Sequence, residues 1–539
     1  MIGVVARAEE AEAAAEFFEL FKTPWERALP GRRYSVLLTT TGLTEGFEAD
    51  VLLAYGSQVQ SIDERRRVEV VDSDDVDAEW EGRRFPLYAG AACFESSGGE
   101  MILRARSGAV GYRGTEGARK TWRIGYNLFA EVRYLLDRGQ PAQFALIPTL
   151  ELHIALLRQL MLESGASFVE IPPKPAGHDF ICCLTHDIDF FGIKRHKWDR
   201  TLAGFAYRAT IGTLLQLVQR RRTVKEAITN WMAAGSLPLV FAGLARDWWQ
   251  PFEDYARADG DRASTYFLAP FKQRSGRALD GTANDVRALP YDVTDIGEEI
   301  GNARRPRKEF GVHGIDAWHD TDAGRAERAR VAEATGAARV GVRMHWLYSS
   351  PDSTRCLEAA GFDYDSTCGY NDAVGFRAGT LQAFRPLGRS TLMELPLSIM
   401  DSAMLYPGRM ALSPARALDM CRDIIATACR FGGALVINWH DRSLAPERLW
   451  VRPYRELLNE VEKNRTAWFA TAGEAVDWFR WRRSIQFRAG AAPGAVTVES
   501  QPAPPGVPAG RLVIHRPHDG RSPLEEIRFS GGEAICSPA

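Results

Sequence analysis

Short apolar runs that end in histidine, aspartate or arginine, rather than in a turn sequence, are the most constraining feature of this 539-residue chain. Runs of this length are typical of buried strands, and strands that alternate with helices form a parallel sheet. Ligands of such folds bind beyond the carboxyl ends of the strands. The pattern therefore predicts an α/β fold with one metal site assembled from several strand ends. The polar ends are Thr185-His186-Asp187-Ile188-Asp189, His313 with His319, Arg343-Met344-His345-Trp346 and Asn438-Trp439-His440-Asp441.

Two aspartates follow the apolar run from Phe180 to Leu184. Residues two apart in an extended backbone project to the same side, so Asp187 and Asp189 can face one point beyond the strand. This arrangement favours metal or acid-base chemistry. The structural alternative is that one aspartate caps a helix or pairs with a nearby cation such as Lys194.

Two histidines, His313 and His319, flank a loop that follows a second strand. On one continuous helix they would lie on different faces, because about 3.6 residues make a turn. They converge only if Gly314 bends the chain between them. Zinc accepts nitrogen and oxygen ligands at about 2.0 to 2.2 Å, and we expect Asp189, His313 and His319 to supply three of them. Asp316 is a rival for the third position.

Two later strands lead to Arg343 and His440. An arginine is always charged and can hold a carboxylate with two parallel hydrogen bonds, so we expect Arg343 to orient the general base. A histidine after a buried strand can titrate near neutrality, and we expect His440 to act as the general acid. The alternative for His440 is a core histidine hydrogen-bonded to Asp441. Packing is the expected role of His345.

The order of these motifs resembles the polysaccharide deacetylase family, the NodB-homology domain of carbohydrate esterase family 4. Thr185–Asp189 is similar to that family's Thr-Phe-Asp-Asp motif, and Glu309–His313 to its Glu-x-Gly-x-His motif. Arg343–Trp346 is similar to its Arg-x-Pro-aromatic motif, and Ile437–His440 to its late Leu-x-His. The resemblance covers residues 178–480. It implies a NodB-type distorted (β/α)7 barrel.

The resemblance also implies an activity, the removal of N-acetyl groups from a sugar of a surface polysaccharide, lipopolysaccharide or other envelope glycan. It implies that Asp187 is the catalytic base and that His440 protonates the departing amine. It assigns one divalent metal ion to Asp189, His313 and His319, and these ligand types favour zinc.

Three further residues complete the expected site. By the same resemblance Arg343 fixes the Asp187 carboxylate, and a backbone N–H near Trp346 completes the oxyanion site. Trp439, beside the expected acid, is a candidate apolar wall for the substrate, with a place in the core as the alternative.

Three departures from the family's motifs bear on these assignments. Ile188 stands between Asp187 and Asp189, which the family places side by side, so their roles as base and ligand are open to exchange. Ala317 occupies the position of the family's second metal histidine, which leaves the third ligand open. His345 replaces the family's proline.

Three blocks follow one another along the chain. Residues 1–172 predict an α+β accessory domain, and a proline-rich linker begins at Ile171. Residues 173–485 predict the barrel, with a helical insertion at 192–261. Residues 486–539 are rich in glycine, proline and valine and predict a short β-rich tail.

Composition narrows the class of partner. The formal net charge is −2, which implies no nucleic-acid partner. The partner that the resemblance implies is an N-acetylated carbohydrate. The eight cysteines include no Cys-x-x-Cys pair and are typical of a reducing compartment. The first residues do not have the pattern of a secretory signal, and the apolar stretch Leu237–Ala245 is shorter than the about 20 residues of a membrane span. We therefore expect a cytoplasmic protein without a transmembrane segment.

Two other functions remain open at this point. One is a C–N amide hydrolase that acts on a small non-sugar substrate with the same barrel. The other is a catalytically silent carbohydrate-binding protein, for which we would expect no bound metal.

Overall fold

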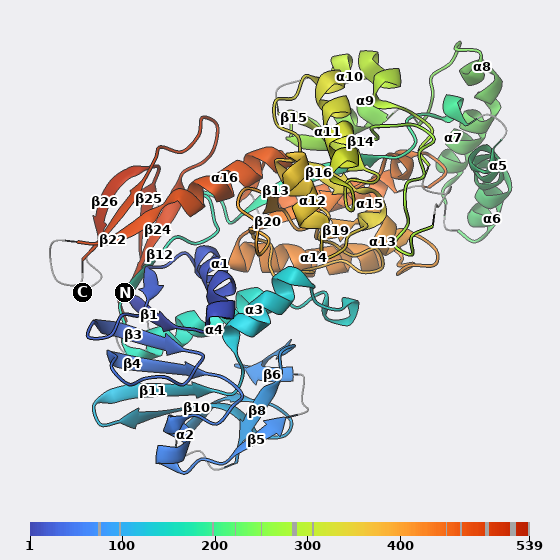
Figure 1. Ribbon diagram of the computed structural model, residues 1–539. Helices are drawn as coiled ribbons and strands as arrows, with labels where there is room; N and C mark the ends of the chain where they lie inside the picture. Colours follow the sequence, from blue (N-terminus) through green and yellow to red (C-terminus); the bar gives the residue numbers. More distant parts are fainter. Residues whose placement is uncertain are drawn as a thin grey trace.

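A computed structural model of the chain describes all residues except 74–76, 96–98, 197–198, 221, 250, 283–287, 304–306, 449, 464–465, 491–494, 518–523 and 537–539. Its central part is a parallel sheet whose strands alternate with helices (Figure 1). The described strands of this sheet follow the order β18-β17-β16-β15-β14-β13-β20-β19, and β21 pairs with β13. Their bounds are β13 Phe180–Ile188, β14 Ser264–Leu268, β15 Lys308–Gly314, β16 Val342–Met344, β17 Tyr364–Asp365, β18 Met393–Glu394, β19 Ile399–Met400, β20 Ala434–Asn438 and β21 Ala467–Phe469.

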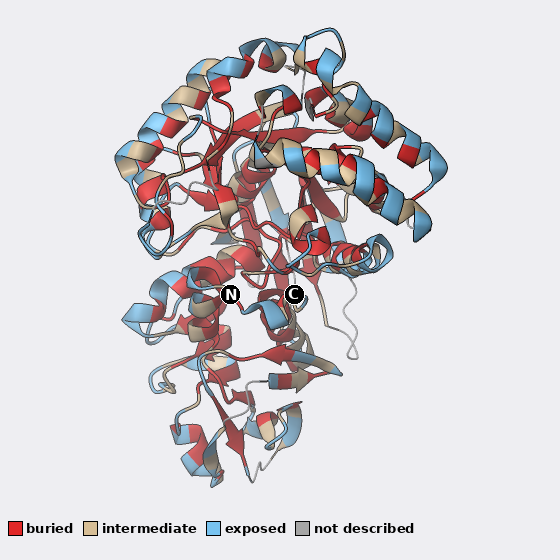
Figure 2. Ribbon diagram, turned by 90° about the vertical axis from the view of Figure 1, so that its right-hand side faces the viewer, coloured by how far each residue is buried: buried red, intermediate tan, exposed pale blue. Residues whose placement is uncertain are grey.

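Helices cover the sheet, so its strands are apolar along their length rather than alternating. Every residue of β13 is buried, for example. Figure 2 shows the buried strands enclosed by helices whose outer faces are exposed. These helices include α9 Pro251–Asp259, α10 Gly297–Ala303, α11 Thr321–Thr335, α12 Ser353–Ala360, α14 Pro414–Phe431, α15 Val451–Lys463 and α16 Ala472–Ser484.

The predicted α/β class with a parallel sheet is confirmed. Among the described residues the sheet is a half-barrel, because β18 and β19 at its two ends do not pair with each other. The chain passes directly from one end to the other through Leu395–Ser398. The carboxyl ends of the strands therefore face a common space on one side of the sheet.

The first part of the chain contains a second sheet with its own buried cluster, against which α1 (Ala11–Phe21), α3 (Leu128–Asp137) and α4 (Thr149–Ser164) pack. Its main path is β2-β1-β3-β4-β11-β10-β9-β6-β7, with β5 and β8 beside it. A division of the chain at residue 172 stays a prediction. The strands are β1 Ile2–Val5, β2 Trp25–Arg27, β3 Arg33–Thr39, β4 Glu48–Tyr55, β5 Val70–Ser73, β6 Asp77–Trp80, β7 Arg83–Pro86, β8 Ala91–Phe94, β9 Glu100–Arg104, β10 Ala109–Glu116 and β11 Arg119–Ile124.

The last residues form two small antiparallel sheets. One contains β22, β23 and β26, and the other joins β24 and β25 to β12 (Phe168–Glu170), which precedes the proline-rich linker. The end of the chain is thus hydrogen-bonded to the segment that enters the central sheet. The bounds are β22 Gln486–Ala489, β23 Val496–Ser500, β24 Gly510–His515, β25 Leu524–Phe529 and β26 Gly532–Cys536.

Short helices lie between β13 and β14, where the sequence predicts an insertion. They form the green lobe at the right of Figure 1. A π-helical segment at 208–212 joins the first two of them. No helix in the described part of the chain has both the length and the apolar character needed to cross a bilayer. The helices are α5 Arg200–Tyr207, α6 Thr213–Val218, α7 Val224–Gly235 and α8 Leu237–Phe241.

Candidate metal and acid-base site

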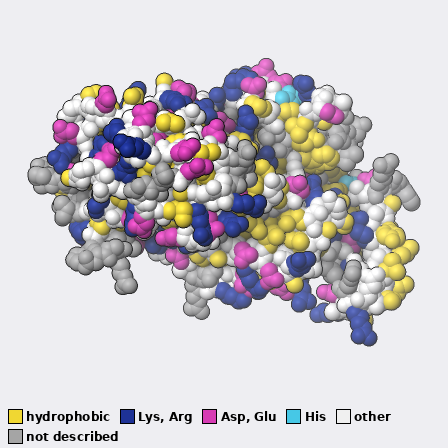
Figure 3. Space-filling view, turned by 90° about the horizontal axis from the view of Figure 1, so that it is seen from below, with side chains coloured by type: hydrophobic (Ala, Val, Ile, Leu, Met, Phe, Trp, Pro, Cys, Tyr) yellow, Lys and Arg dark blue, Asp and Glu magenta, His cyan; other side chains and the backbone are white. Residues whose placement is uncertain are grey.

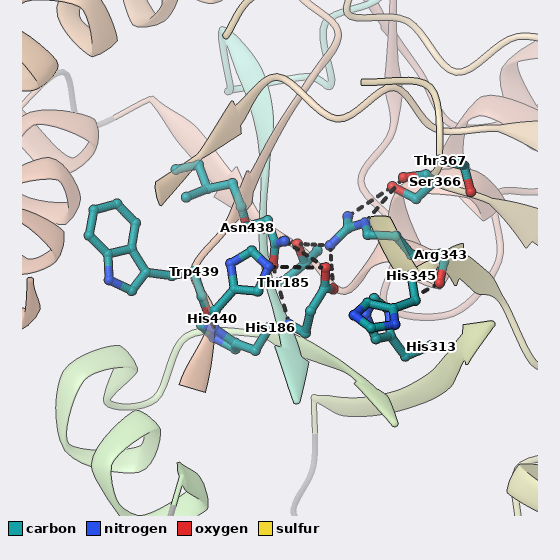
Figure 4. Close-up of polar contacts among 12 residues, drawn as sticks. Thr185, His186, His313, Arg343, His345, Ser366, Thr367, Asn438, Trp439 and His440 are labelled. Carbon is teal, nitrogen blue, oxygen red and sulfur yellow. Dashed lines mark hydrogen bonds and ion pairs between the residues drawn. The ribbon is translucent and has the colours of Figure 1, made fainter. Parts of the chain in front are cut away.

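Asp187 lies at the centre of the site, near the carboxyl end of β13, and is 2% exposed. Its Oδ1 accepts a hydrogen bond from Arg343 Nη1 at 3.0 Å, and its Oδ2 accepts one from Asn438 Nδ2 at 2.7 Å. These donors come from β16 and from the last residue of β20. Figure 4 shows Arg343, Asn438 and His440 directed to the same point. Three strand ends therefore converge on one carboxylate, as the sequence predicts.

The Arg343 guanidinium is fully buried and is fixed by hydrogen-bond acceptors from three residues. Besides Asp187 it donates to Thr185 Oγ1 at 2.7 Å, to Ser366 Oγ at 2.9 Å and to the Ser366 carbonyl at 3.1 Å. It also lies 4.5 Å from the centre of the Phe267 ring. Burial acts to raise the pKa of Asp187, but the Arg343 charge and the neighbouring histidines outweigh it, so the net shift is downward. Asp187 is thus a carboxylate at neutral pH and can accept a proton.

Asp189, His313 and His345 form a group of possible metal ligands whose ligand atoms all lie within 4.8 Å of one another. The Asp189 Oδ1 atom lies 3.3 Å from His313 Nε2 and 3.9 Å from His345 Nε2. Burial acts to raise the pKa of Asp189, yet the histidines around it, His313, His345 and His440, produce a net downward shift. One carboxylate oxygen and two imidazole nitrogens thus meet at one point.

The hydrogen bonding of His313 tests whether this group suits a metal. Its Nδ1 lies 3.1 Å from the Arg343 carbonyl oxygen, which can only accept, so Nδ1 carries a hydrogen. In the neutral ring Nε2 then has a free lone pair, and it faces an Asp189 oxygen. Both atoms are buried and neither has a hydrogen-bond partner among the described residues. Tetrahedral ligands at about 2.1 Å from an ion are about 3.4 Å apart, so a spacing of 3.3 Å fits a small divalent cation.

His319, the third ligand expected from the sequence, is not brought to this group. Its Nε2 lies 3.3 Å from Asp316 Oδ1. Asp316 in turn pairs with Arg274 at 3.0 Å, so this rival ligand is also engaged elsewhere. The loop that carries both residues is held by Glu327 on α11, which accepts from the backbone N–H groups of Ile315 and Asp316. His345 takes the third position instead.

The backbone beside His345 has an unusual conformation. Trp346 and Leu347 have φ angles of 64° and 53°, in the left-handed region that few residues other than glycine adopt. Each such residue costs about 1–3 kcal/mol, and such strain concentrates at functional sites. Asn371 Nδ2 donates to the Trp346 carbonyl at 2.7 Å and so supports this turn. One feature of the sequence does indicate this place for His345: it follows Arg343 by two residues, just as Asp189 follows Asp187.

His440 lies just beyond β20 and faces the other side of the Asp187 carboxylate, with 3.8 Å between Nε2 and Oδ2. Its Nδ1 and Asp401 Oδ1 are 2.6 Å apart, and its backbone N–H donates to Asp401 Oδ2 at 2.9 Å. Burial acts to lower the pKa of His440, but the charge and hydrogen bond of Asp401, together with Asp189 and Asp187, raise it to about 10. His440 is therefore a cation with its Nε2 proton toward the site.

Asp401 begins α13 (Asp401–Leu405) and was not identified from the sequence. Asp441, which the sequence offered as the hydrogen-bond partner of His440, instead accepts hydrogen bonds from the backbone N–H groups of Phe190 and Phe191. The Trp439 ring is buried and stacks on Tyr454 with 5.0 Å between ring centres, so it belongs to the core rather than to the cavity wall. Figure 4 shows it directed away from the histidines.

A cavity of about 650 Å³ opens over these residues. Acid-base groups, possible metal ligands and an aromatic ring share its wall, which gives room for a ligand of the size of a sugar. Among the residues that line it are Asp187, Asp189, His313, His345, Trp346 and His440.

No protein-family model matches the sequence, and neither does any curated protein. Solved structures do match. A candidate polysaccharide deacetylase from Mycobacterium smegmatis is 18% identical, with 57% of this chain and 94% of that chain covered and a TM-score of 0.34. A probable polysaccharide deacetylase from Pseudomonas aeruginosa PAO1 is 14% identical, with 57% and 94% covered and a TM-score of 0.35. Puue allantoinase is 13% identical, with 57% and 91% covered and a TM-score of 0.33. Polysaccharide deacetylases are thus among the structures to which this chain is similar, and at these scores the function has to be inferred from the site itself.

Proposed function

We propose that this protein is a metal-dependent hydrolase that removes N-acetyl groups from a sugar of a surface polysaccharide, lipopolysaccharide or other envelope glycan. The observation that carries the proposal is the position of Asp187 between Arg343 and His440, beside the Asp189, His313 and His345 group. A carboxylate kept ionised and an imidazole kept protonated are the two proton-transfer groups that amide hydrolysis needs. The order of the sequence motifs supports the choice of an N-acetyl sugar as substrate.

Asp189, His313 and His345 are the residues proposed to hold the metal. One carboxylate and two imidazoles suit zinc, and also manganese, iron, cobalt or nickel. A divalent ion at this place supplies Lewis acidity toward a carbonyl oxygen and lowers the pKa of a coordinated water. His313 is oriented for this role by its Nδ1 hydrogen bond to the Arg343 carbonyl.

Asp187 is proposed to take a proton from the attacking water. Its Oδ1 and Oδ2 each accept a hydrogen bond from a fixed donor, which orients the carboxylate toward the cavity. As the water oxygen bonds to the acetyl carbonyl carbon, the water loses a proton to Asp187. Arg343 keeps the carboxylate ionised until that moment.

His440 is proposed to give the proton at Nε2 to the departing nitrogen as the C–N bond breaks. The products are the free amine of the sugar and acetic acid, which releases its proton to water and leaves as acetate. Asp401 holds the His440 ring through Nδ1 and stabilises the imidazolium form. A return of the proton from Asp187 to the imidazole, over the 3.8 Å that separates them, restores both groups.

Acetate release from a panel of substrates tests the proposal. The panel contains N-acetylated monosaccharides, oligosaccharides and sugar conjugates on one side and small linear and cyclic amides on the other. We expect release from an acetylated sugar and a loss of at least about 100-fold in Asp187→Asn and in His440→Gln. Turnover of small amides alone would favour the non-sugar hydrolase. Metal-free protein with no turnover of any substrate would favour the silent binding protein.

A further inference from the structure

Arg442 and Arg448 line the same cavity as Asp187 and His440. Neither guanidinium forms an ion pair with a described carboxylate, and the buried Nε atom of each has no hydrogen-bond partner among the described residues. Half-buried arginines in a cavity wall are ordinarily paired, because a charge partly removed from water is costly unless it is compensated. This part of the cavity wall therefore carries two positive charges with no carboxylate in direct contact, and Asp189, Asp441 and Glu447 act on them only at longer range.

Aromatic rings hold both guanidinium groups in place. Arg442 lies 4.0 Å from the centre of the Phe190 ring, and Arg448 lies 5.2 Å from that of Tyr406 and 5.0 Å from that of Trp450. Stacking on a ring fixes the plane of a guanidinium, and the N–H groups that remain can meet a planar oxyanion. One N–H of Arg448 is hydrogen-bonded to the Tyr406 side chain. Burial lowers the pKa of Arg442, and the nearby charge of Arg448 lowers it further.

We propose that Arg442 and Arg448 bind an oxyanion, a phosphate or a carboxylate, that the substrate carries. This proposal rests on the proposed function, because it assigns the anion to the molecule that presents its amide to Asp187. The guanidinium fork matches the oxygens of either group. The substrate class is then an anionic N-acetyl sugar, either a sugar phosphate or an acidic sugar.

Binding of inorganic phosphate, pyrophosphate and glucuronate, measured by calorimetry on the full chain, tests the site without requiring turnover. The variants are Arg442→Gln, Arg448→Gln and His313→Ala, with Arg452→Gln as control, since Arg452 is an exposed arginine paired with Glu456. We expect binding at least tenfold weaker in the first two, and binding retained in His313→Ala and in the control. The preferred anion then identifies the phosphate or the carboxylate class.

Two results overturn the assignment. One is binding that is lost in His313→Ala and kept in Arg448→Gln, which would place the anion at the metal group. The other is no binding of any of the three anions by the wild-type chain. Neither result depends on acetate release, so a failure of this site is distinguishable from a failure of the proposed function.

A second, independent observation concerns the lobe formed by α5 to α8. Of the 20 exposed large hydrophobic residues in the described part of the chain, 11 lie between Tyr207 and Leu244. They recur at three- and four-residue intervals, which places them on one face of each helix. Figure 3 shows hydrophobic side chains along the right-hand edge, where this lobe lies. On α5, the π-helical segment and α6 they are Tyr207, Ile211, Leu214, Leu215 and Val218, and on α7 they are Val224, Ile228, Trp231 and Met232, all 41–75% exposed.

The charge of the same segment has the opposite sign to that of the chain as a whole. Residues 201–245 contain five lysines and arginines and one glutamate, whereas the whole chain has a net charge of −2. Helices with an apolar face, a tryptophan and basic flanks lie in the interface of anionic membranes. Arg220 and Lys225 are exposed cations of the segment, so two copies of the face would bring like charges together, which favours lipid over a second copy of the chain.

The lobe is also attached to the cavity wall. Arg222 Nη2 donates to the Glu447 carbonyl at 2.8 Å, and Trp249 Nε1 lies 3.4 Å from Glu447 Oε2. Glu447 directly precedes Arg448, which lines the cavity. Any external surface on which the lobe docks therefore lies close to the residues that line the cavity.

We infer that this apolar face docks on an anionic lipid surface. Cosedimentation of the full chain with phosphatidylglycerol–phosphatidylcholine vesicles, and with phosphatidylcholine vesicles alone, tests it. Variants with Leu214→Glu and Met232→Glu replace one exposed residue on each face, and Leu29→Glu is the control, because Leu29 is equally exposed (54%) but outside the lobe. We expect at least fivefold more bound protein on the anionic vesicles, lost in the two lobe variants and kept in the control.

Sedimentation velocity of the same proteins tests whether a second copy of the chain covers the apolar face instead. A dimer that Leu214→Glu dissociates, without vesicle binding by the wild type, would assign the face to a second copy and overturn the inference. Equal vesicle binding by the wild type and both lobe variants would overturn it as well.

Discussion

Asp187 and Arg343 form an ion pair of 3.0 Å, although β14 and β15 separate their strands in the sheet. Two residues further along each chain segment, Asp189 and His345 approach to 3.9 Å. Residues two apart share a face of an extended segment, so the curvature of the sheet places this ion pair next to a pair of possible metal ligands. The position of one pair therefore fixes the position of the other.

Arg343→Gln should move the acid limb of the kcat/KM profile to higher pH. Burial acts to raise the pKa of Asp187, and Arg343 is the main group that lowers it. Removal of Arg343 should therefore raise the pKa of Asp187. The base is then protonated at pH values where the wild type is ionised. We expect at least about tenfold less activity at pH 7, and a destabilisation of about 3–5 kcal/mol from the unpaired buried charge. A folded variant whose acid limb stays in place would show that Arg343 does not control Asp187; Arg325→Gln, on the surface, is the control.

Asp401→Asn should lower the pKa of His440 from about 10, because Asp401 is the largest group that raises it. His440 acts as an acid in its protonated form, so the basic limb of the activity profile should move to lower pH. The chemical shift of the labelled His440 ring, followed through a pH titration, reports the same change without substrate. Asp441→Asn is the matched control, because Asp441 binds backbone N–H groups instead of His440. An unchanged His440 midpoint in Asp401→Asn would contradict the assignment.

Glu327 should make the protein less stable as the pH rises from 4.5 to 7. Burial raises the pKa of Glu327 from 4.5 to about 7, in spite of two backbone hydrogen bonds. Between these values the folded state holds a proton that the unfolded state has released, so stability is highest below 4.5 and is lost through pH 7. The shift corresponds to about 3 kcal/mol. Urea unfolding at pH 5 and pH 8 should show a smaller difference in Glu327→Gln than in the wild type, and an equal difference in both would refute the shift.

The sequence predicts the parallel sheet well, because its strands are apolar over their whole length and end in polar residues. It also predicts the pair of Asp187 and Arg343, since both directly follow or end such runs. It does not predict the third member of the Asp189, His313 and His345 group, because the path of the loop between His313 and His319 depends on Glu327, a residue of the next helix. The residues next to His345 in the sequence indicate a packing role for it, so its place beside Asp189 and His313 was not expected.

Two other features depend on tertiary contacts that no local pattern carries. Asp401 supports His440 from 39 residues away in the chain, so no motif links them. Trp439 precedes His440 and its ring lies on the opposite side of the backbone, stacked on Tyr454. Its place in the core depends on Tyr454, a residue of α15. Of the two tryptophans expected to contact the substrate, only Trp346 lines the cavity.

Metal content per chain, measured by elemental analysis of purified protein, tests the central claim most directly. The proteins are the wild type, Asp189→Ala, His313→Ala and His345→Ala, with His319→Ala as the matched control. We predict one divalent ion per chain in the wild type and in His319→Ala, and its loss in the other three. Retention of the metal in His345→Ala together with its loss in His319→Ala would contradict the site, and so would a wild-type protein that binds no metal after reconstitution.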